Sequence, residues 1–210
     1  AVSKMPQAKD DGEIAPLGDT FSSLFQNANY RNGVLSQIFY VGAQIMCWTY
    51  IYQYAEAINI TSENAANYQF VCFIVFLIGR TIGTYLLRFI NSGKLLFQFA
   101  IMAGVCVLAT VFIEGIVGLY ALVGISFFMS LMFPTIYGIA LEDLDEKESK
   151  IGAAGLVMAI VGGALMPKLQ GMIIDLGGSG VNDTQIMGVS EVNFSFLLPL
   201  LCFLFIAYFG

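Results

Sequence analysis

An amide and an aromatic ring stand four residues apart, at Gln44 and Trp48, in a stretch from 32 to 55 that carries no charged residue. Tyr40 and Tyr52 continue the same spacing on either side, and helical side chains spaced by four lie along one slowly turning stripe. An amide offers both a donor and an acceptor to hydroxyl groups, and aromatic faces stack against the C–H faces of a sugar ring. Such a stripe suits an uncharged polyol.

A purely structural explanation of the stripe also stays open. Interhelical hydrogen bonds and an aromatic belt at a membrane interface account for Tyr52 and Tyr54, which lie near the end of the stretch. They account less well for Gln44 and Trp48, near its middle. We therefore predict that Gln44 and Trp48, with Tyr40, contact a substrate, and that Tyr52 and Tyr54 anchor the interface.

The composition is that of an integral membrane protein. The 210 residues are 58% hydrophobic and 11% charged, and the mean hydropathy is +0.78, values that water-soluble domains do not reach. A net charge of −6 does not favour a nucleic-acid partner. The sequence has no histidine, the commonest metal ligand and neutral-pH base, and its four cysteines lie in apolar runs without metal-like spacing. We therefore predict no enzyme, no cofactor and no metal site.

A helix needs about 20 mostly apolar residues to cross roughly 30 Å of hydrocarbon, and six stretches of the sequence meet this requirement. Helices are expected because lipid offers no partner to an unpaired backbone group. The predicted fold class is an all-α membrane protein, one bundle of six transmembrane helices at 33–56, 64–90, 94–113, 116–141, 151–174 and 192–208.

Basic residues lie only at alternate connections, apart from two within the spans. They precede the first span, follow the second or follow the fourth, at Lys4, Lys9, Arg31, Arg88, Lys94, Lys147 and Lys150. The positive-inside rule then places both termini in the cytoplasm of a multi-pass protein in the inner, or plasma, membrane. Residues 1–31 are predicted to be a cytoplasmic linker, in which Asp19-Thr20 can cap a short amphipathic helix. Both ends of the chain look as if they continue into a longer protein.

Carboxylates are predicted at span ends and in loops only, so the proton-binding group that a proton-coupled carrier needs in the membrane interior is missing. Two cations do lie within spans. Arg80 is about nine residues, hence ~13 Å, from the predicted end of its helix, and we predict that it pairs with Glu142 or Asp143. Lys168 is expected to extend its side chain towards the nearer interface.

Two spans contain helix-breaking or small residues. In the fourth span Pro134 removes one helical hydrogen bond, and we predict an interruption at Phe133-Pro134-Thr135-Ile136-Tyr137-Gly138 that either lines a cavity or is tolerated near a helix end. The fifth span is rich in small residues, among them Gly162 and Gly163, and Pro167 follows them. This face suits a helix that slides or bends during gating, and static close packing would produce it equally.

Several motifs together resemble one family. They look like the C-terminal half of the bacterial L-fucose:proton symporters of the major facilitator superfamily, in order, from about Asn29 to the end. The motifs are Tyr40-Val41-Gly42-Ala43-Gln44 with Cys47-Trp48, Ala65-Ala66-Asn67-Tyr68, Gly79-Arg80-Thr81-Ile82-Gly83-Thr84, Met129-Ser130 with Pro134-Thr135-Ile136, and Val157-Met158-Ala159-Ile160-Val161-Gly162-Gly163.

The resemblance implies a twelve-helix carrier built from two six-helix bundles, each a three-plus-three repeat, with the sugar cavity between them and alternating access by rocking. This chain would be the second bundle, and the partners implied are the N-terminal bundle, a monosaccharide, a proton and the lipid bilayer. The proton-binding carboxylates would belong to the first bundle. The motif positions imply that Gln44, Trp48, Tyr40, Asn67 and Phe133 bind the sugar. We also predict gating or structural roles for Arg80, Gly83, Pro134, Gly162, Gly163 and Pro167.

The sugar itself stays open. Phe133 stands where the fucose permeases have a tyrosine, which removes a hydroxyl. The related glucose/galactose carriers tend to have a glutamate where Gln44 stands and no tryptophan at Trp48, so these two residues favour the fucose branch. Two further hypotheses are a self-contained six-helix membrane interaction subunit and, less favoured for want of interior acids, a multidrug exporter.

Overall fold

The computed structural model describes residues 17–178, 180–181 and 183–210, with side chains from Ser22 onward. The predictions made for residues 1–16 lie outside the described residues. The chain folds into α1 (Leu17–Gln26), α2 (Ala28–Thr49), α3 (Ile51–Ala57), α4 (Ser62–Leu86), α5 (Ser92–Phe112), α6 (Ile116–Met129), α7 (Met132–Leu141), α8 (Glu146–Met158), the 3₁₀ turn η1 (Ala159–Val161), α9 (Gly162–Ile174), β1 (Gln185–Ile186), β2 (Val189–Ser190), α10 (Glu191–Ser195) and α11 (Leu197–Phe209).

Six helical segments are long and apolar enough to cross a membrane, which confirms the predicted all-α, six-span fold. They are Ala28–Ala57, Ser62–Leu86, Ser92–Phe112, Ile116–Leu141, Glu146–Ile174 and Glu191–Phe209.

Two spans start earlier than their hydropathy indicated. Asn27 caps α2 by accepting the backbone N–H groups of Asn29 and Tyr30, and Asp145 caps α8 by accepting that of Glu148. These side chains satisfy orphan donors of a first helical turn, so each helix extends into polar sequence.

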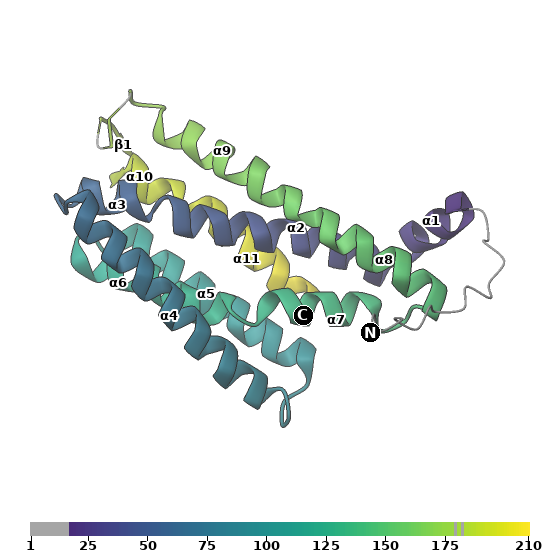
Figure 1. The fold of residues 1–210 in the computed structure, drawn as a ribbon. Coiled ribbons are helices and arrows are strands. Elements are labelled where there is room, and N and C mark those ends of the chain that lie inside the picture. Colours follow the sequence, from purple (N-terminus) through teal and green to yellow (C-terminus); the bar gives the residue numbers. More distant parts are fainter. Residues whose placement is uncertain (1–16, 179, 182) are drawn as a thin grey trace, which may run out of the picture.

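The bundle has two distinct ends (Figure 1). The end that we call the hairpin end holds α3, α10 and the β1–β2 hairpin, in which Gln185 pairs with Ser190 and Ile186 with Val189. The opposite end, which we call the basic end, holds the α4–α5 and α7–α8 connections. The C terminus belongs to this end too, because Gly210 lies against Gly93 at the start of α5. The hairpin was not predicted. Its two turn residues, Met187 and Gly188, both have positive φ, as a tight two-residue turn requires.

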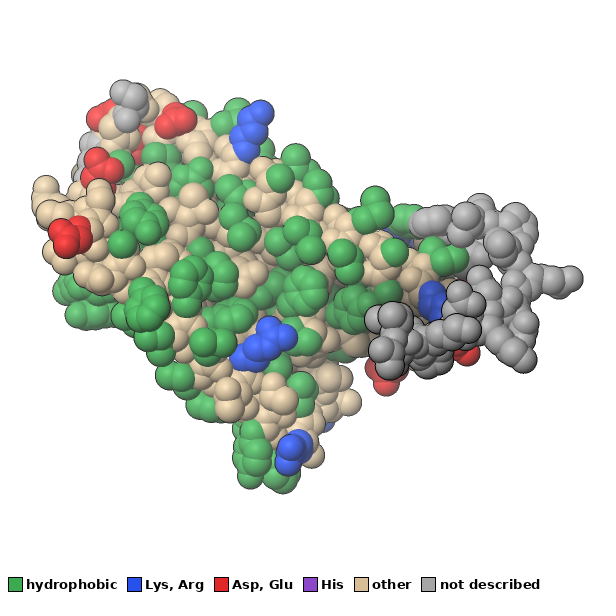
Figure 2. All heavy atoms as spheres, viewed as in Figure 1, with side chains coloured by type: hydrophobic (Ala, Val, Ile, Leu, Met, Phe, Trp, Pro, Cys, Tyr) green, Lys and Arg blue, Asp and Glu red, His purple; other side chains and the backbone are tan. Residues whose placement is uncertain are grey.

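Helix α2 lies at the centre of the packing, because it contacts α7, α9 and α11, whereas α5 packs against α6 and α11. Two spans are far less covered than the others. Buried residues make up 17% of the most apolar window of α4 and 22% of that of the α8–α9 span, against 50 to 56% in the other four. Figure 2 shows hydrophobic side chains over the length of the bundle and acidic ones at the hairpin end. A bilayer or another bundle can cover such apolar faces.

The fourth span is interrupted, but one turn earlier than predicted. The break lies at Ser130 and Leu131, between α6 and α7, and the segment from Phe133 to Gly138 is regular helix. Pro134 is the third residue of α7, where a first-turn N–H has no partner within the helix, so the proline costs no hydrogen bond there. Gly79 of α4 packs directly against this break, since a Cβ at Gly79 would collide with the carbonyl oxygen of Phe127.

Three buried polar side chains of α10 form hydrogen bonds to other elements near the hairpin end. Glu191 accepts the backbone N–H of Asp183 at 2.8 Å, Asn193 donates to the carbonyl of Thr110 at 3.1 Å, and Ser195 accepts from the Gln170 amide at 3.0 Å. Each bond reaches a different element, so α10 joins the hairpin loop, α5 and α9.

Candidate functional site

Trp48 is held by two neighbouring helices. Its indole N–H donates to the hydroxyl of Ser126 on α6 at 3.1 Å. Its ring meets Phe73 and Phe76 of α4 edge-to-face, with ring centroids 5.0 and 5.3 Å away. Trp48 is only half-buried and Phe73 is 43% exposed. The three rings therefore form an aromatic surface that is accessible at the side of the bundle.

Gln44 lies one turn before Trp48 on α2 and is half-buried. Its amide makes no hydrogen bond to any other residue in the described part of the chain. An amide without an internal partner keeps both its donors and its acceptor for another molecule. Gln44 and Trp48 thus supply, side by side, the two kinds of contact that a sugar requires.

Tyr40 continues the stripe but lies deeper, and Phe133 of α7 packs against it. Tyr40 is 1% exposed, and its ring meets the ring of Phe133 on α7 edge-to-face at 6.0 Å. Phe133 is half-buried. The pair packs α2 against α7 one turn before Gln44. Tyr40 therefore supports the candidate site from inside the bundle and is not itself exposed at its surface.

Asn67 lies apart from the other candidates. It is exposed near the start of α4 and lines a pocket of about 400 Å³ with Ile60, Asn64 and Tyr68. Six residues, or about 9 Å of helical rise, separate it from Phe73. In the described residues, nothing brings Asn67 together with Gln44.

The predicted partner of Arg80 is wrong. Among the described residues the one ion pair joins Lys150 and Glu146, 3.2 Å apart. Arg80 is exposed on α4, whereas Glu142 and Asp143 are exposed beyond the end of α7. In the described residues, neither of these carboxylates therefore forms an ion pair with Arg80. Lys168 is likewise exposed on α9.

Tyr54 does not anchor an interface, although the sequence predicted that it would. It is fully buried, and its hydroxyl donates to the carbonyl oxygens of Ile113 and Gly115, each at 3.3 Å. These carbonyls belong to the turn between α5 and α6, so the two bonds join Tyr54 to that turn. Tyr52, at 39% exposed, has the exposure that the interface prediction requires.

The glycines of the fifth span lie against α2. A Cβ at Gly162 would collide with the carbonyl oxygen of Ile38, and one at Gly163 would lie 3.1 Å from the side chains of Val41 and Ile45. Both glycines directly follow η1, so the irregular turn sits where the two backbones touch. Gly83 is similarly close to Leu131, at the α6–α7 break. Gating roles for these residues stay predictions.

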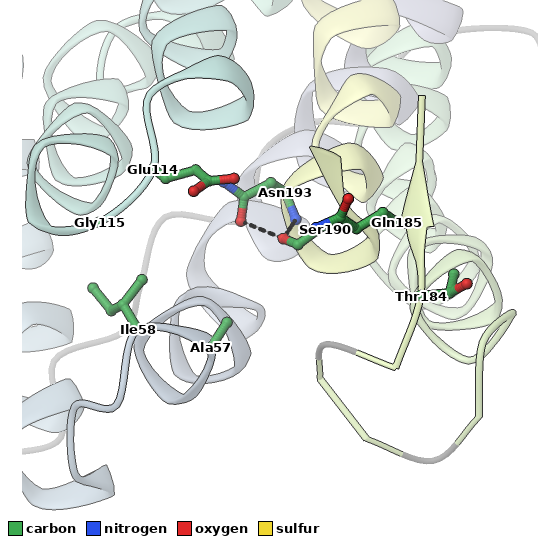
Figure 3. A pocket seen from close by; sticks show the side chains of 8 residues that line it. All are labelled: Ala57, Ile58, Glu114, Gly115, Thr184, Gln185, Ser190 and Asn193. Carbon is green, nitrogen blue, oxygen red and sulfur yellow. Dashed lines mark hydrogen bonds between the residues drawn. The ribbon is translucent and has the colours of Figure 1, made fainter. Parts of the chain in front are cut away.

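A separate pocket of about 210 Å³ opens at the hairpin end (Figure 3). It is lined by Ala57, Ile58, Glu114, Gly115, Thr184, Gln185, Ser190 and Asn193. Ser190 donates to Asn193 within it at 3.0 Å, and Asn193 also donates to the backbone of α5. The pocket is about nine residues, or ~13 Å along the first span, beyond Trp48. None of the predicted sugar-binding residues lines it.

Sequence reasoning missed Ser126, Phe73 and Phe76. Phenylalanines in an apolar span carry no signal of their own, because lipid-facing and packing residues have the same composition. Ser126 is a single hydroxyl in the apolar α6, and its role depends on a residue 78 positions away. In the part of the chain that the structure describes, no group of His, Cys, Asp and Glu is arranged to hold a metal ion.

Known proteins share both the sequence and the fold. No family model matches the sequence. The L-fucose-proton symporter of Haemophilus influenzae is 50% identical over 211 residues, which cover 100% of this chain and 47% of that protein. The chain is homologous to the L-fucose-proton symporters. A putative glucose/galactose transporter of Helicobacter pylori shares 31% identity, with coverage of 99% and 48%.

The symporter homology extends to three dimensions. A crystal structure of a major facilitator superfamily transporter, FucP, in the outward conformation matches with a TM-score of 0.83 and 31% identity, over 99% of this chain and 48% of that one. The six-helix bundle is therefore the fold of about half of a major facilitator carrier. The chain spans about half the length of the L-fucose-proton symporter that it matches.

Proposed function

We propose that this chain is the C-terminal bundle of a proton-coupled monosaccharide carrier, with L-fucose as the first candidate substrate. The observation that carries the proposal is the pair Gln44 and Trp48. Gln44 is an amide without a partner among the described residues, and Trp48, one turn away, is part of an accessible aromatic surface. The homology to sugar carriers supports the same conclusion.

The sugar site has one wall in this chain. Gln44 contacts hydroxyl groups and Trp48 stacks on the ring, while Tyr40 and Phe133 support them from below. Asn67 contributes only from the hairpin end, as a residue met on the way into or out of the cavity. The opposite wall belongs to an N-terminal six-helix bundle, which also covers the exposed faces of α4 and of the α8–α9 span.

The coupling proton binds in that other bundle. The described carboxylates within helices lie in first or last turns, as Glu63 does in α4 and Glu191 in α10. Proton symport needs a carboxylate in the membrane interior that is protonated and released as the carrier alternates. Rocking of the two bundles about the site then exposes the sugar to each side in turn.

The basic end faces the cytoplasm. Arg88, Lys94, Lys147 and Lys150 lie in or beside its connections, together with several acidic residues, whereas the described connections at the hairpin end contain acidic residues and no Lys or Arg. The positive-inside rule therefore places both termini of this chain in the cytoplasm and the hairpin outside an inner (plasma) membrane.

A glucose or galactose carrier is the second candidate, since one relative is a putative glucose/galactose transporter. Gln44 and Trp48 favour fucose, whereas Phe133, in the place of a tyrosine, leaves the choice of sugar to experiment. A self-contained six-helix interaction subunit is the alternative outside transport. Sequencing the gene upstream of Ala1 separates the two, because a carrier needs six further spans.

The test is uptake of labelled L-fucose by the full-length gene product in membrane vesicles with an imposed proton gradient. Wild type is expected to accumulate fucose in competition with unlabelled sugar, and the Trp48→Ala and Gln44→Ala variants are expected to lose at least tenfold in uptake. Tyr52→Phe is the matched control, because this tyrosine lies on the same stripe near the interface. Normal uptake in both alanine variants would sink the site assignment, and no uptake of any hexose by wild type would sink the function.

A further inference from the structure

The hydrogen bond between Trp48 and Ser126 determines what the tryptophan can offer a substrate. Ser126 lies on α6 and is fully buried, and its hydroxyl accepts the indole N–H at 3.1 Å. That N–H is the only polar group of a tryptophan side chain, and it donates only. Since it is already used inside the bundle, Trp48 presents only carbon surface to a sugar.

Two contacts fix the orientation of the ring. Phe73 and Phe76 meet the indole edge-to-face with interplanar angles of 85° and 73°, an arrangement that aromatic quadrupoles favour. Ser126 accepts the N–H at the polar edge of the same ring. The side chain has two rotatable bonds, so contacts from α4 and α6 together restrict its rotation.

Building on the proposed function, we infer that Ser126 is a positioning residue, which turns Trp48 so that its face stacks on the sugar and its N–H does not compete for sugar hydroxyls. Hydroxyl recognition then belongs to Gln44, one turn away, whose amide has no partner in the described residues. Ser126 itself touches no substrate, because α6 is covered there and the hydroxyl is occupied.

The experiment measures KM and kcat for L-fucose uptake by the full-length carrier reconstituted in proteoliposomes. Ser126→Ala removes the acceptor of the indole N–H, so the ring is expected to rotate away from the orientation that stacks on the sugar. We expect KM to rise at least threefold while kcat changes less than twofold. Ser36→Ala is the matched control, because Ser36 is also fully buried but its hydroxyl has no hydrogen-bond partner among the described residues. It is expected to leave KM unchanged.

A double-mutant cycle separates positioning from general packing. Trp48→Phe keeps a ring but removes the N–H, so adding Ser126→Ala to this variant is expected to raise KM no further. Size-exclusion profiles establish that each variant is folded. An equal rise of KM in both backgrounds, or an unchanged KM in Ser126→Ala while Trp48→Ala impairs uptake, would overturn the positioning role alone. If Trp48→Ala and Gln44→Ala leave uptake normal, the proposed site falls and this inference with it.

Discussion

The hydroxyl of Tyr50 donates a hydrogen bond to the carbonyl oxygen of Pro167 at 2.7 Å. Tyr50 is the junction between α2 and α3, and Pro167 lies in the middle of α9. Proline lacks an N–H and weakens the helix around it. The bond therefore ties two irregular points of neighbouring spans to each other.

Removing this bond should destabilise the bundle slightly. Tyr50→Phe keeps the ring, and we expect a loss of about 0.5–1.5 kcal/mol in the free energy of unfolding, the usual net worth of one hydrogen bond. The melting temperature of the full-length carrier in detergent measures it. Tyr52→Phe is the control, since Tyr52 makes no hydrogen bond in the described residues. Equal shifts in the two variants would contradict the prediction.

The contact between α9 and α2 should not tolerate even one methyl group. Gly162→Ala would drive a Cβ into the carbonyl of Ile38, and we expect a cost of about 1–3 kcal/mol from overpacking. Gly138→Ala is the matched helical control, because a Cβ there meets nothing within 4 Å. The yield of monodisperse carrier and its melting temperature give the comparison. A Gly162→Ala variant as stable as Gly138→Ala would refute the close approach.

The end of α5 should depend on Asn193. This side chain donates to the carbonyl of Thr110, one of the last four carbonyls of α5, which have no partner inside the helix. Asn193→Ala is expected to cost about 1–3 kcal/mol by leaving a buried acceptor unpaired and to speed hydrogen exchange in residues 109–113. Asn64→Ala, at an exposed position, is the control. Unchanged exchange in the Asn193 variant would show that water replaces the amide.

The orientation can be read by chemical labelling. Gln185 and Lys147 are both exposed, at the hairpin and basic ends respectively. In a variant without native cysteines, Gln185→Cys is expected to react in intact cells with a maleimide that cannot cross membranes. Lys147→Cys is expected to react only after permeabilisation. The reverse pattern would invert the proposed topology.

Hydropathy was sufficient to predict the six spans, because a bilayer demands the same apolar length of each. It could not predict where helices α2 and α8 begin, since the polar side chains of Asn27 and Asp145 extend them. A spacing of four brought Gln44 and Trp48 together correctly, since that relation is local to one helix. Whether they bind sugar stays a prediction.

Contacts between different spans could not be predicted from the sequence. The partner of Trp48 is a serine 78 residues away, and no periodicity connects the two. Tyr54 was misjudged for the same reason: its distance from the span end suggested an interface, but the carbonyls that bind it belong to another pair of helices. The pairing of Arg80 with Glu142 or Asp143 failed because opposite charge alone does not set the direction of a side chain.

Four of the six spans are divided in the described chain, at Tyr50, at Ser130–Leu131, at Ala159–Val161 and at Phe196, whereas α4 and α5 are continuous. Spectroscopic labels placed on α8 and on α9 lie on two helical segments of the fifth span, which the 3₁₀ turn η1 joins. Helix α5 is unbroken and packs against α6 and α11. It can therefore serve as the common reference from which distances to both labels are measured. A movement seen from α5 to α9 but not from α5 to α8 would then be a bend of one helix, and not a rotation of the whole bundle.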